Sequence, residues 1–92
     1  MAIVFGFGFE DLGRGVMTKL RDLEIGSRGR VTSVDTSNDI GVRLLEMGVT
    51  PGAELTLLGK APWGDPLEYE VRGYRLSLRR TEAARVQIEL LT

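Results

Sequence analysis

The sequence has neither histidine nor cysteine among its 92 residues. Histidine is the commonest general base and the commonest transition-metal ligand, so its absence leaves serine and threonine without their usual activator and disfavours a strong iron site. The absence of cysteine excludes disulfides, thiolate nucleophiles and cysteine-ligated metals. No glycine-rich pattern has the spacing that cradles a phosphate. We therefore expect no catalytic, metal-binding or cofactor-binding residues, and no cofactor.

The sequence also lacks a long apolar run and a clear excess of charge. No segment approaches the roughly 20 apolar residues that a membrane-spanning helix needs, and no signal-peptide pattern is present, so we expect a cytoplasmic location. The net charge is −1, from 12 basic and 13 acidic residues. Binding to nucleic acid through phosphates usually needs a positive excess, which makes that partner an unfavoured one.

The length predicts one domain, preceded by a short extension. In residues 1–16, Phe5, Phe7 and Phe9 alternate with glycine, which is a poor strand pattern, and more regular sequence begins at Met17. We expect residues 1–16 to be a loosely ordered extension, with an apolar arm that docks on a partner as the alternative. Residues 17–92 are expected to be the folded domain.

One helix is predicted with both of its ends. Asn38 and its neighbours offer capping oxygens, and Ile40, Leu44 and Met47 fall on one face. Gly48 is expected to end the helix in a left-handed conformation, and Val49 to fold back onto it. The following Pro51-Gly52 turn then leads into a strand that begins near residue 53. Shorter helical turns are predicted after Thr18 and Thr81, each as the capping residue. Leu20, Leu23 and Ile25 are expected to pack into one end of the core.

Strands are predicted from alternating apolar residues around 28–35, 53–61 and 85–91 and in a hairpin of residues 67–80, with a bulge or bend at Gly59. The clearest hairpin is expected to turn at Gly73-Tyr74. This register pairs Val71 with Leu76, Glu70 with Ser77, Tyr69 with Leu78 and Glu68 with Arg79. Because no long helical crossover joins the strands, we predict a mainly β fold: a small antiparallel barrel of about five strands with one helix and short helical turns.

Positive charge is concentrated in residues 72–85, which contain Arg72, Arg75, Arg79, Arg80 and Arg85. Tyr74 lies among them. Tyrosine and arginine are the residue types that dominate protein-binding hot spots, so a protein partner is favoured over nucleic acid here. Trp63 in the loop "PWGDP" is expected to fold back over an open end of the barrel; the alternative is an exposed contact residue.

The segments "RLLEMGVTPGAEL" and "APWGDPLEYEVRGYRLSLRRTEAARV" resemble the FeoA family of ferrous iron transport accessory proteins. The likeness extends over about residues 17–91, and departs from the family pattern at the extension and at Trp63. It implies an SH3-like barrel in the cytoplasm that assists FeoB, a membrane ferrous iron transporter with a GTP-binding domain. It also implies a non-enzymatic role, with membrane association through FeoB.

We expect the partner to contact the arginine-rich hairpin, with the outer face of the helix as the second choice. The candidate contact residues are Arg72, Tyr74, Arg75, Arg79, Arg80, Arg43 and Trp63. The alternative function is a stand-alone regulatory or nucleic-acid-binding barrel, similar to the C-terminal module of iron- and manganese-dependent repressors. Association between copies of the chain stays open.

Overall fold

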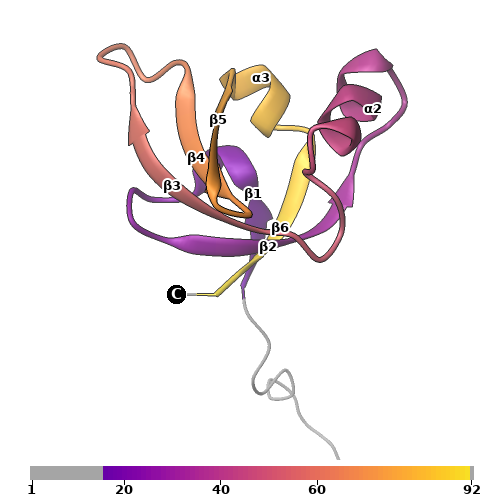
Figure 1. Cartoon of the computed structure of the whole chain (residues 1–92), viewed down its shortest axis with the longest axis horizontal. Coiled ribbons are helices and arrows are strands. Elements are labelled where there is room, and N and C mark those ends of the chain that lie inside the picture. Colours follow the sequence, from indigo (N-terminus) through magenta and orange to yellow (C-terminus); the bar gives the residue numbers. More distant parts are fainter. Residues whose placement is uncertain (1–15, 92) are drawn as a thin grey trace, which may run out of the picture.

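A computed structural model of the chain describes residues 16–91 as one antiparallel sheet in the strand order β1-β6-β2-β3-β4-β5 (Figure 1). The strands are β1 (Met17–Lys19), β2 (Arg28–Val34), β3 (Glu54–Lys60), β4 (Leu67–Val71), β5 (Tyr74–Leu78) and β6 (Val86–Leu90). The helices are η1 (Leu20–Asp22), α2 (Asp39–Glu46) and α3 (Arg80–Ala83). The predicted extension lies outside the described residues except for its last residue.

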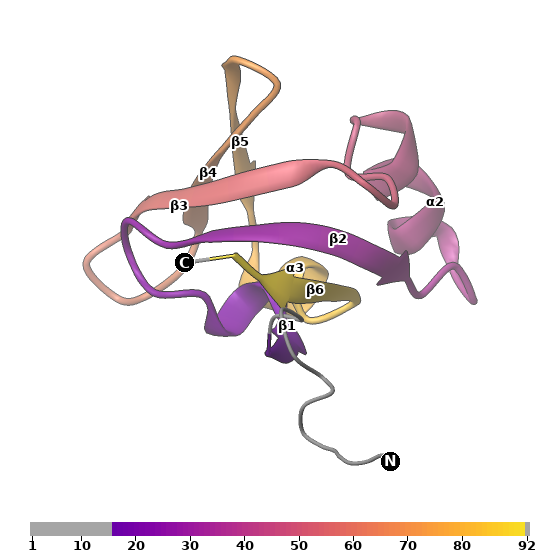
Figure 2. The ribbon, with the colours of Figure 1, turned by 90° about the horizontal axis from the view of Figure 1, so that it is seen from below.

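The sheet curls around a single apolar core, which confirms the predicted small antiparallel barrel. Seen from below, β2 and β3 run side by side across the molecule, and β4 and β5 run steeply to them because the sheet is strongly curled (Figure 2). Alternation along the strands directs one face inward. The fully covered residues include Leu20, Val31, Leu44, Leu55, Leu57, Leu67, Tyr69, Val71, Val86 and Ile88.

Tyr69 is the largest side chain of this core and its main polar member. Its hydroxyl donates a hydrogen bond to the carbonyl of Leu20 at 2.9 Å, which ties β4 to η1. Burial raises the pKa of Tyr69, because the phenolate is disfavoured away from water. The hydroxyl therefore serves as a fixed donor inside the core.

The N-terminal part of the barrel differs from the prediction. Thr18 does not cap a helical turn: it lies in β1, opposite Ile88 of β6, and the turn begins at Leu20. Three residues are too few to be recognised as a strand by alternation, and the pairing with β6 decides their conformation. Ile25 is 60% exposed and lies outside the core, whereas Leu20 and Leu23 are buried as expected.

Helix α2 begins and ends as the sequence predicts. The side chain of Asn38 accepts hydrogen bonds from the N–H groups of Ile40 and Gly41. At the other end, the N–H of Gly48 bonds the carbonyl of Leu45, and the N–H of Val49 bonds that of Leu44. With a φ of +99° at Gly48, this is a Schellman ending.

The chain then turns a second time into β3. The N–H of Ala53 bonds the carbonyl of Thr50 at 2.9 Å, and Gly52 has a φ of +94°, as a type II turn requires. The predicted bulge near Gly59 is also observed, since the pairing of β3 with β4 shifts between Leu57 and Gly59.

The register of the β4–β5 hairpin was predicted wrongly. Its turn lies at Arg72-Gly73, with φ values of +53° and +85°, which is the pattern of a type I′ turn. The observed pairs are Val71 with Tyr74, Glu70 with Arg75, Tyr69 with Leu76, Glu68 with Ser77 and Leu67 with Leu78. A shift of two residues leaves every side chain on its expected face, so alternation does not distinguish the two registers.

Gly41, in the first turn of α2, tests how closely the helix packs on the chain that leads into it. A Cβ at this position would lie 1.8 Å from the carbonyl oxygen of Asp35. We expect Gly41→Ala to lower the free energy of unfolding by about 3 kcal/mol in urea denaturation, because overpacking outweighs the better helix propensity of alanine.

The matched control is Gly59→Ala, at a position where a Cβ meets no atom within 4 Å. We expect a change of no more than about 1 kcal/mol there. Equal losses for the two variants would contradict the close packing of α2 on Asp35.

Candidate functional site

The tip of the β4–β5 hairpin is attached to the C-terminal end of α2. The hydroxyl of Tyr74 donates a hydrogen bond to the carbonyl of Met47. Beside it, Nη2 of Arg72 donates to Oγ1 of Thr50 at 3.2 Å. The ring reaches over Gly48, where a Cβ would lie 2.6 Å from the tyrosine oxygen. Two segments that are distant in the sequence thus form one surface.

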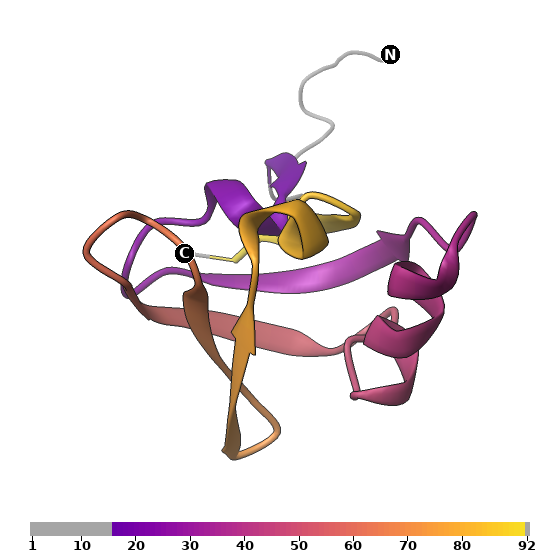
Figure 3. The same ribbon diagram turned by 90° about the horizontal axis from the view of Figure 1, so that it is seen from above.

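We name this area, made of Met47, Thr50, Arg72 and Tyr74, the hairpin–helix surface. Tyr74 is 43% exposed and Met47 is 37% exposed, so both present apolar area to solvent. The Tyr74 side chain is also held in place by its bond to the Met47 carbonyl. Figure 3 shows the hairpin tip and the end of α2 on the side of the barrel opposite to β1. Exposed aromatic, methionine and arginine side chains are enriched in protein interfaces.

Of the seven predicted contact residues, the structure places Arg72 and Tyr74 on this surface. Arg43 is exposed on α2, one turn before Met47, whose N–H bonds the Arg43 carbonyl. The hairpin and the helix, which the sequence offered as separate choices, are therefore neighbours. Periodicity placed Met47 on the same helix face as the buried Leu44, yet Met47 is 37% exposed. Alternation gave no signal for Thr50, because its contribution depends on the tertiary contact.

Arg79, Arg80 and Trp63 lie at the other end of β5. A carboxylate oxygen of Asp65 accepts a hydrogen bond from the N–H of Arg80 at 3.0 Å, and Glu82 accepts one from the N–H of Arg79 at 2.8 Å. These two carboxylates therefore accept hydrogen bonds from backbone N–H groups at the N-terminal end of α3. The prediction of Thr81 as the capping residue is wrong, because Thr81 lies within the first turn.

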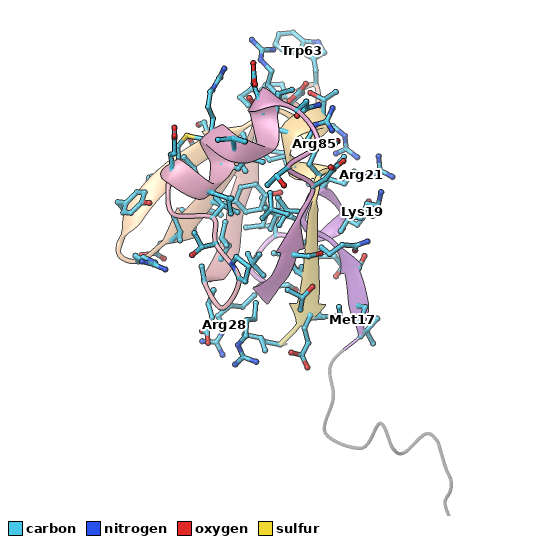
Figure 4. The ribbon with its side chains drawn as sticks, turned by 90° about the vertical axis from the view of Figure 1, so that its right-hand side faces the viewer. Met17, Lys19, Arg21, Arg28, Trp63 and Arg85 are labelled. Atoms are coloured by element: carbon cyan, nitrogen blue, oxygen red, sulfur yellow. The ribbon has the colours of Figure 1, made fainter. Side chains whose placement is uncertain are left out.

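Trp63 does not fold back over the barrel. It is 88% exposed and stands at the end of the molecule farthest from Met17 (Figure 4). Two hydrogen bonds hold the loop that carries it. The N–H of Arg80 donates to Asp65, and the N–H of Ala61 donates to the carbonyl of Pro66. The exposed alternative is therefore the observed one.

Arg75 and Arg85 are each paired with a carboxylate. Arg75 lies 3.5 Å from Glu68, whose other oxygen accepts from Ser77 at 2.8 Å. The predicted pairing of Glu68 with Arg79 is wrong because of the two-residue change of register. Arg85 lies 3.3 Å from Asp35. The arginines of residues 72–85 are consequently distributed over several surfaces and do not form one basic face.

The surroundings of Asp35 stabilise its ionised, negatively charged form. A hydrogen bond from the N–H of Ser37, helped by the Ser37 side chain and by Arg85, holds the pKa of Asp35 below its ordinary value. A depressed pKa adds stability that is present above the ordinary carboxyl pKa. That contribution is lost as the pH falls through the lower value in the folded protein.

Two kinds of feature are absent from the described part of the chain. Within residues 16–91, no three or more acidic residues gather closely enough to hold a metal ion. The same residues contain no helix of the length and apolarity required to cross a bilayer.

Comparison with known proteins gives a family match over most of the chain. The model of the FeoA domain matches residues 18–90. A fusion protein of Fe(2+) transport protein A and Fe(2+) transporter FeoB from Porphyromonas gingivalis is 34% identical over 74 residues. These residues are 80% of this chain but only 9% of the fusion protein, so the chain corresponds to a small part of that relative.

Solved structures agree with the family match. An FeoA-like protein from Clostridium acetobutylicum has a TM-score of 0.77 at 35% identity, over 86% of this chain and 90% of that one. FeoA from Stenotrophomonas maltophilia, complexed with zinc, has a TM-score of 0.70 at 33% identity, over 78% and 89%. That protein is described as a procaryotic SH3 domain protein and as a candidate activating factor for ferrous iron transport. The SH3-like fold predicted from the sequence is thereby confirmed.

The contact between Gly48 and Tyr74 is testable by a double-mutant cycle. Alanine at Gly48 has to adopt a positive φ, which costs about 1–2 kcal/mol, and its Cβ also meets the Tyr74 hydroxyl. We expect Gly48→Ala to cost about 1 kcal/mol less in a Tyr74→Phe background than in the wild-type chain, as measured by urea denaturation. Strict additivity would show that the Tyr74 hydroxyl does not lie against Gly48.

Proposed function

Because the chain belongs to the FeoA domain family, we propose that it is a non-enzymatic binding protein that docks on a FeoB-type ferrous iron transporter and modulates its activity. Residues 17–92 form the binding module in this proposal. Docking takes place on the cytoplasmic side of the transporter. The bound transporter then holds the chain near the membrane.

The observation that carries this proposal is the fusion protein. In the relative from Porphyromonas gingivalis, a segment 34% identical to this chain is part of the same polypeptide as an Fe(2+) transporter FeoB. Linking two modules raises their effective concentration for each other to the millimolar range for short linkers, which favours even a weak contact. A separate chain of the same family has to supply the equivalent contact through its own surface.

The hairpin–helix surface has the properties that such a contact needs. Tyr74 and Met47 expose apolar area at its centre, and Arg72 adds a charged donor beside them. The tyrosine is held in place by its bond to the Met47 carbonyl, so little side-chain freedom is lost when a partner binds. Of the other predicted contacts, Arg79, Arg80 and Trp63 lie at the opposite end of β5, away from this cluster. Arg75 is paired with Glu68.

The proposal predicts that Tyr74→Ala weakens binding to the transporter by about tenfold or more, since truncating a central aromatic anchor typically costs 2 kcal/mol or more. The measurement is a titration of the full chain against a FeoB-type transporter in detergent or nanodiscs, with and without guanine nucleotide. Tyr74→Phe retains the ring and is expected to keep most of the affinity.

Leu58→Ala is the matched control, because Leu58 is 37% exposed and lies on β3, away from the contact of the hairpin tip with α2. Circular dichroism and urea midpoints check that each variant is folded. Absence of wild-type binding at tens of micromolar contradicts the proposed function. Wild-type binding that Tyr74→Ala leaves unchanged contradicts only the choice of surface.

A further inference from the structure

A second surface feature lies away from the hairpin tip. An open groove of about 760 Å³ runs between β1 with η1 on one side and α3 on the other, with the ends of β2 and β6 as its floor. Its charged lining residues are Lys19, Arg21, Asp35, Arg80 and Arg85. We name it the basic groove. In Figure 4, Arg85, Arg21 and Lys19 follow one another along one side of the molecule.

The pairing of the strands explains why these side chains converge. Lys19 of β1 lies opposite Gln87 of β6, and Gln87 lies opposite Ser33 of β2. These three residues form a polar row across neighbouring strands, on the face away from the core. Arg80 of helix α3 and Arg21 of η1 line the same groove.

The groove holds four cationic side chains against one carboxylate, in a chain whose net charge is −1. Within residues 16–91, the side chains of Lys19 and Arg80 form no ion pair and no hydrogen bond. Arg21 meets only its neighbour Asp22, at 3.4 Å, and both groups are exposed. Exposed pairs of this kind contribute little, so these cations stay available to a ligand.

Asp35 decides where in the groove an anion can bind. It accepts a contact from Arg85 at 3.3 Å and from the N–H of Ser37, and its depressed pKa keeps it ionised at neutral pH. It therefore repels an anion at the Arg85 end. Lys19, Arg21 and Arg80 are the lining cations that do not pair with Asp35, and Thr81 also lines the groove. We therefore expect an anion to bind beside these three cations.

We propose that the basic groove binds a small multivalent oxyanion of the phosphate class, held by Lys19, Arg21 and Arg80. Guanidinium groups match the geometry of phosphate oxygens, and the lysine adds a compact charge. Thr81 and Gln87 supply neutral donors. No aromatic side chain lines the groove, so it offers no platform for stacking a base and recognises the phosphate itself. The net charge of −1 disfavours a long polyanion.

This site is independent of the docking proposed above, because it uses different residues on a different side of the barrel. The phosphate group that binds such a site can belong to a free anion or to a lipid headgroup. Two probes distinguish these sources: inorganic pyrophosphate, and vesicles of phosphatidylglycerol compared with vesicles of phosphatidylcholine. The readout for pyrophosphate is the shift of backbone amide signals in the isotope-labelled full chain; the readout for vesicles is co-sedimentation.

We expect saturable shifts at Lys19, Thr81 and Gln87 with pyrophosphate, or sedimentation with phosphatidylglycerol alone if the source is a lipid. In either case Arg21→Gln combined with Arg80→Gln is expected to weaken binding by about tenfold or more. The control combines Arg28→Gln with Lys60→Gln, which removes the same charge at two exposed positions outside the groove. It is expected to change the affinity by no more than about twofold.

Three outcomes overturn the proposal. The first is that neither probe binds in a saturable way. The second is that the control pair weakens binding as much as the groove pair, which indicates unspecific attraction. The third is that an acidic peptide without phosphate binds the groove where both phosphate probes fail. All four substituted side chains are at the surface, and we expect each variant to fold. Urea denaturation midpoints check this.

Discussion

The left-handed turn at Arg72 and Gly73 is the constraint on which the arrangement of the proposed docking surface depends. Two successive residues with positive φ fix the register of β4 with β5. That register places Tyr74 directly after the turn, where its hydroxyl reaches the carbonyl of Met47. With a turn one residue later, the tyrosine would itself be a turn residue, and the end of α2 would lose its cover.

The family motifs are joined to each other in space. The segment with Met47 and Gly48 contacts the hairpin tip at Tyr74, and the loop with Asp65 contacts the start of α3 at Arg80. Each end of strand β5 is thus fixed by a hydrogen bond to a different motif. The motif residues in these contacts stabilise the fold. Tyr74 is also exposed, and in the proposed function it contacts the partner as well.

Much of the fold follows from the sequence because burial imposes periodicity. Alternation places Leu55 and Leu57 inward, and the left-handed Gly48 ends α2 as expected. The register of the hairpin was missed because a shift of two residues preserves both faces. The strand β1 was missed because three residues carry too little pattern, and their conformation is decided by pairing with β6.

The candidate site was only partly predictable for a related reason. Sequence identified Tyr74 and Arg72 by residue type, but their neighbours at the end of α2 are brought there by a tertiary contact. The same holds for the basic groove, whose Lys19 and Arg80 come from elements far apart in the chain. Residue type alone also gave no measure of exposure, as the outward position of Trp63 shows.

The most direct test of the docking surface is amide chemical-shift mapping of the isotope-labelled chain with the cytoplasmic part of a FeoB-type transporter. The account predicts that the shifts concentrate at residues 47–50 and 72–75, which are separate in sequence but adjacent in the structure. Shifts confined to the loop of Trp63, or to the side of the barrel formed by β1, would contradict it.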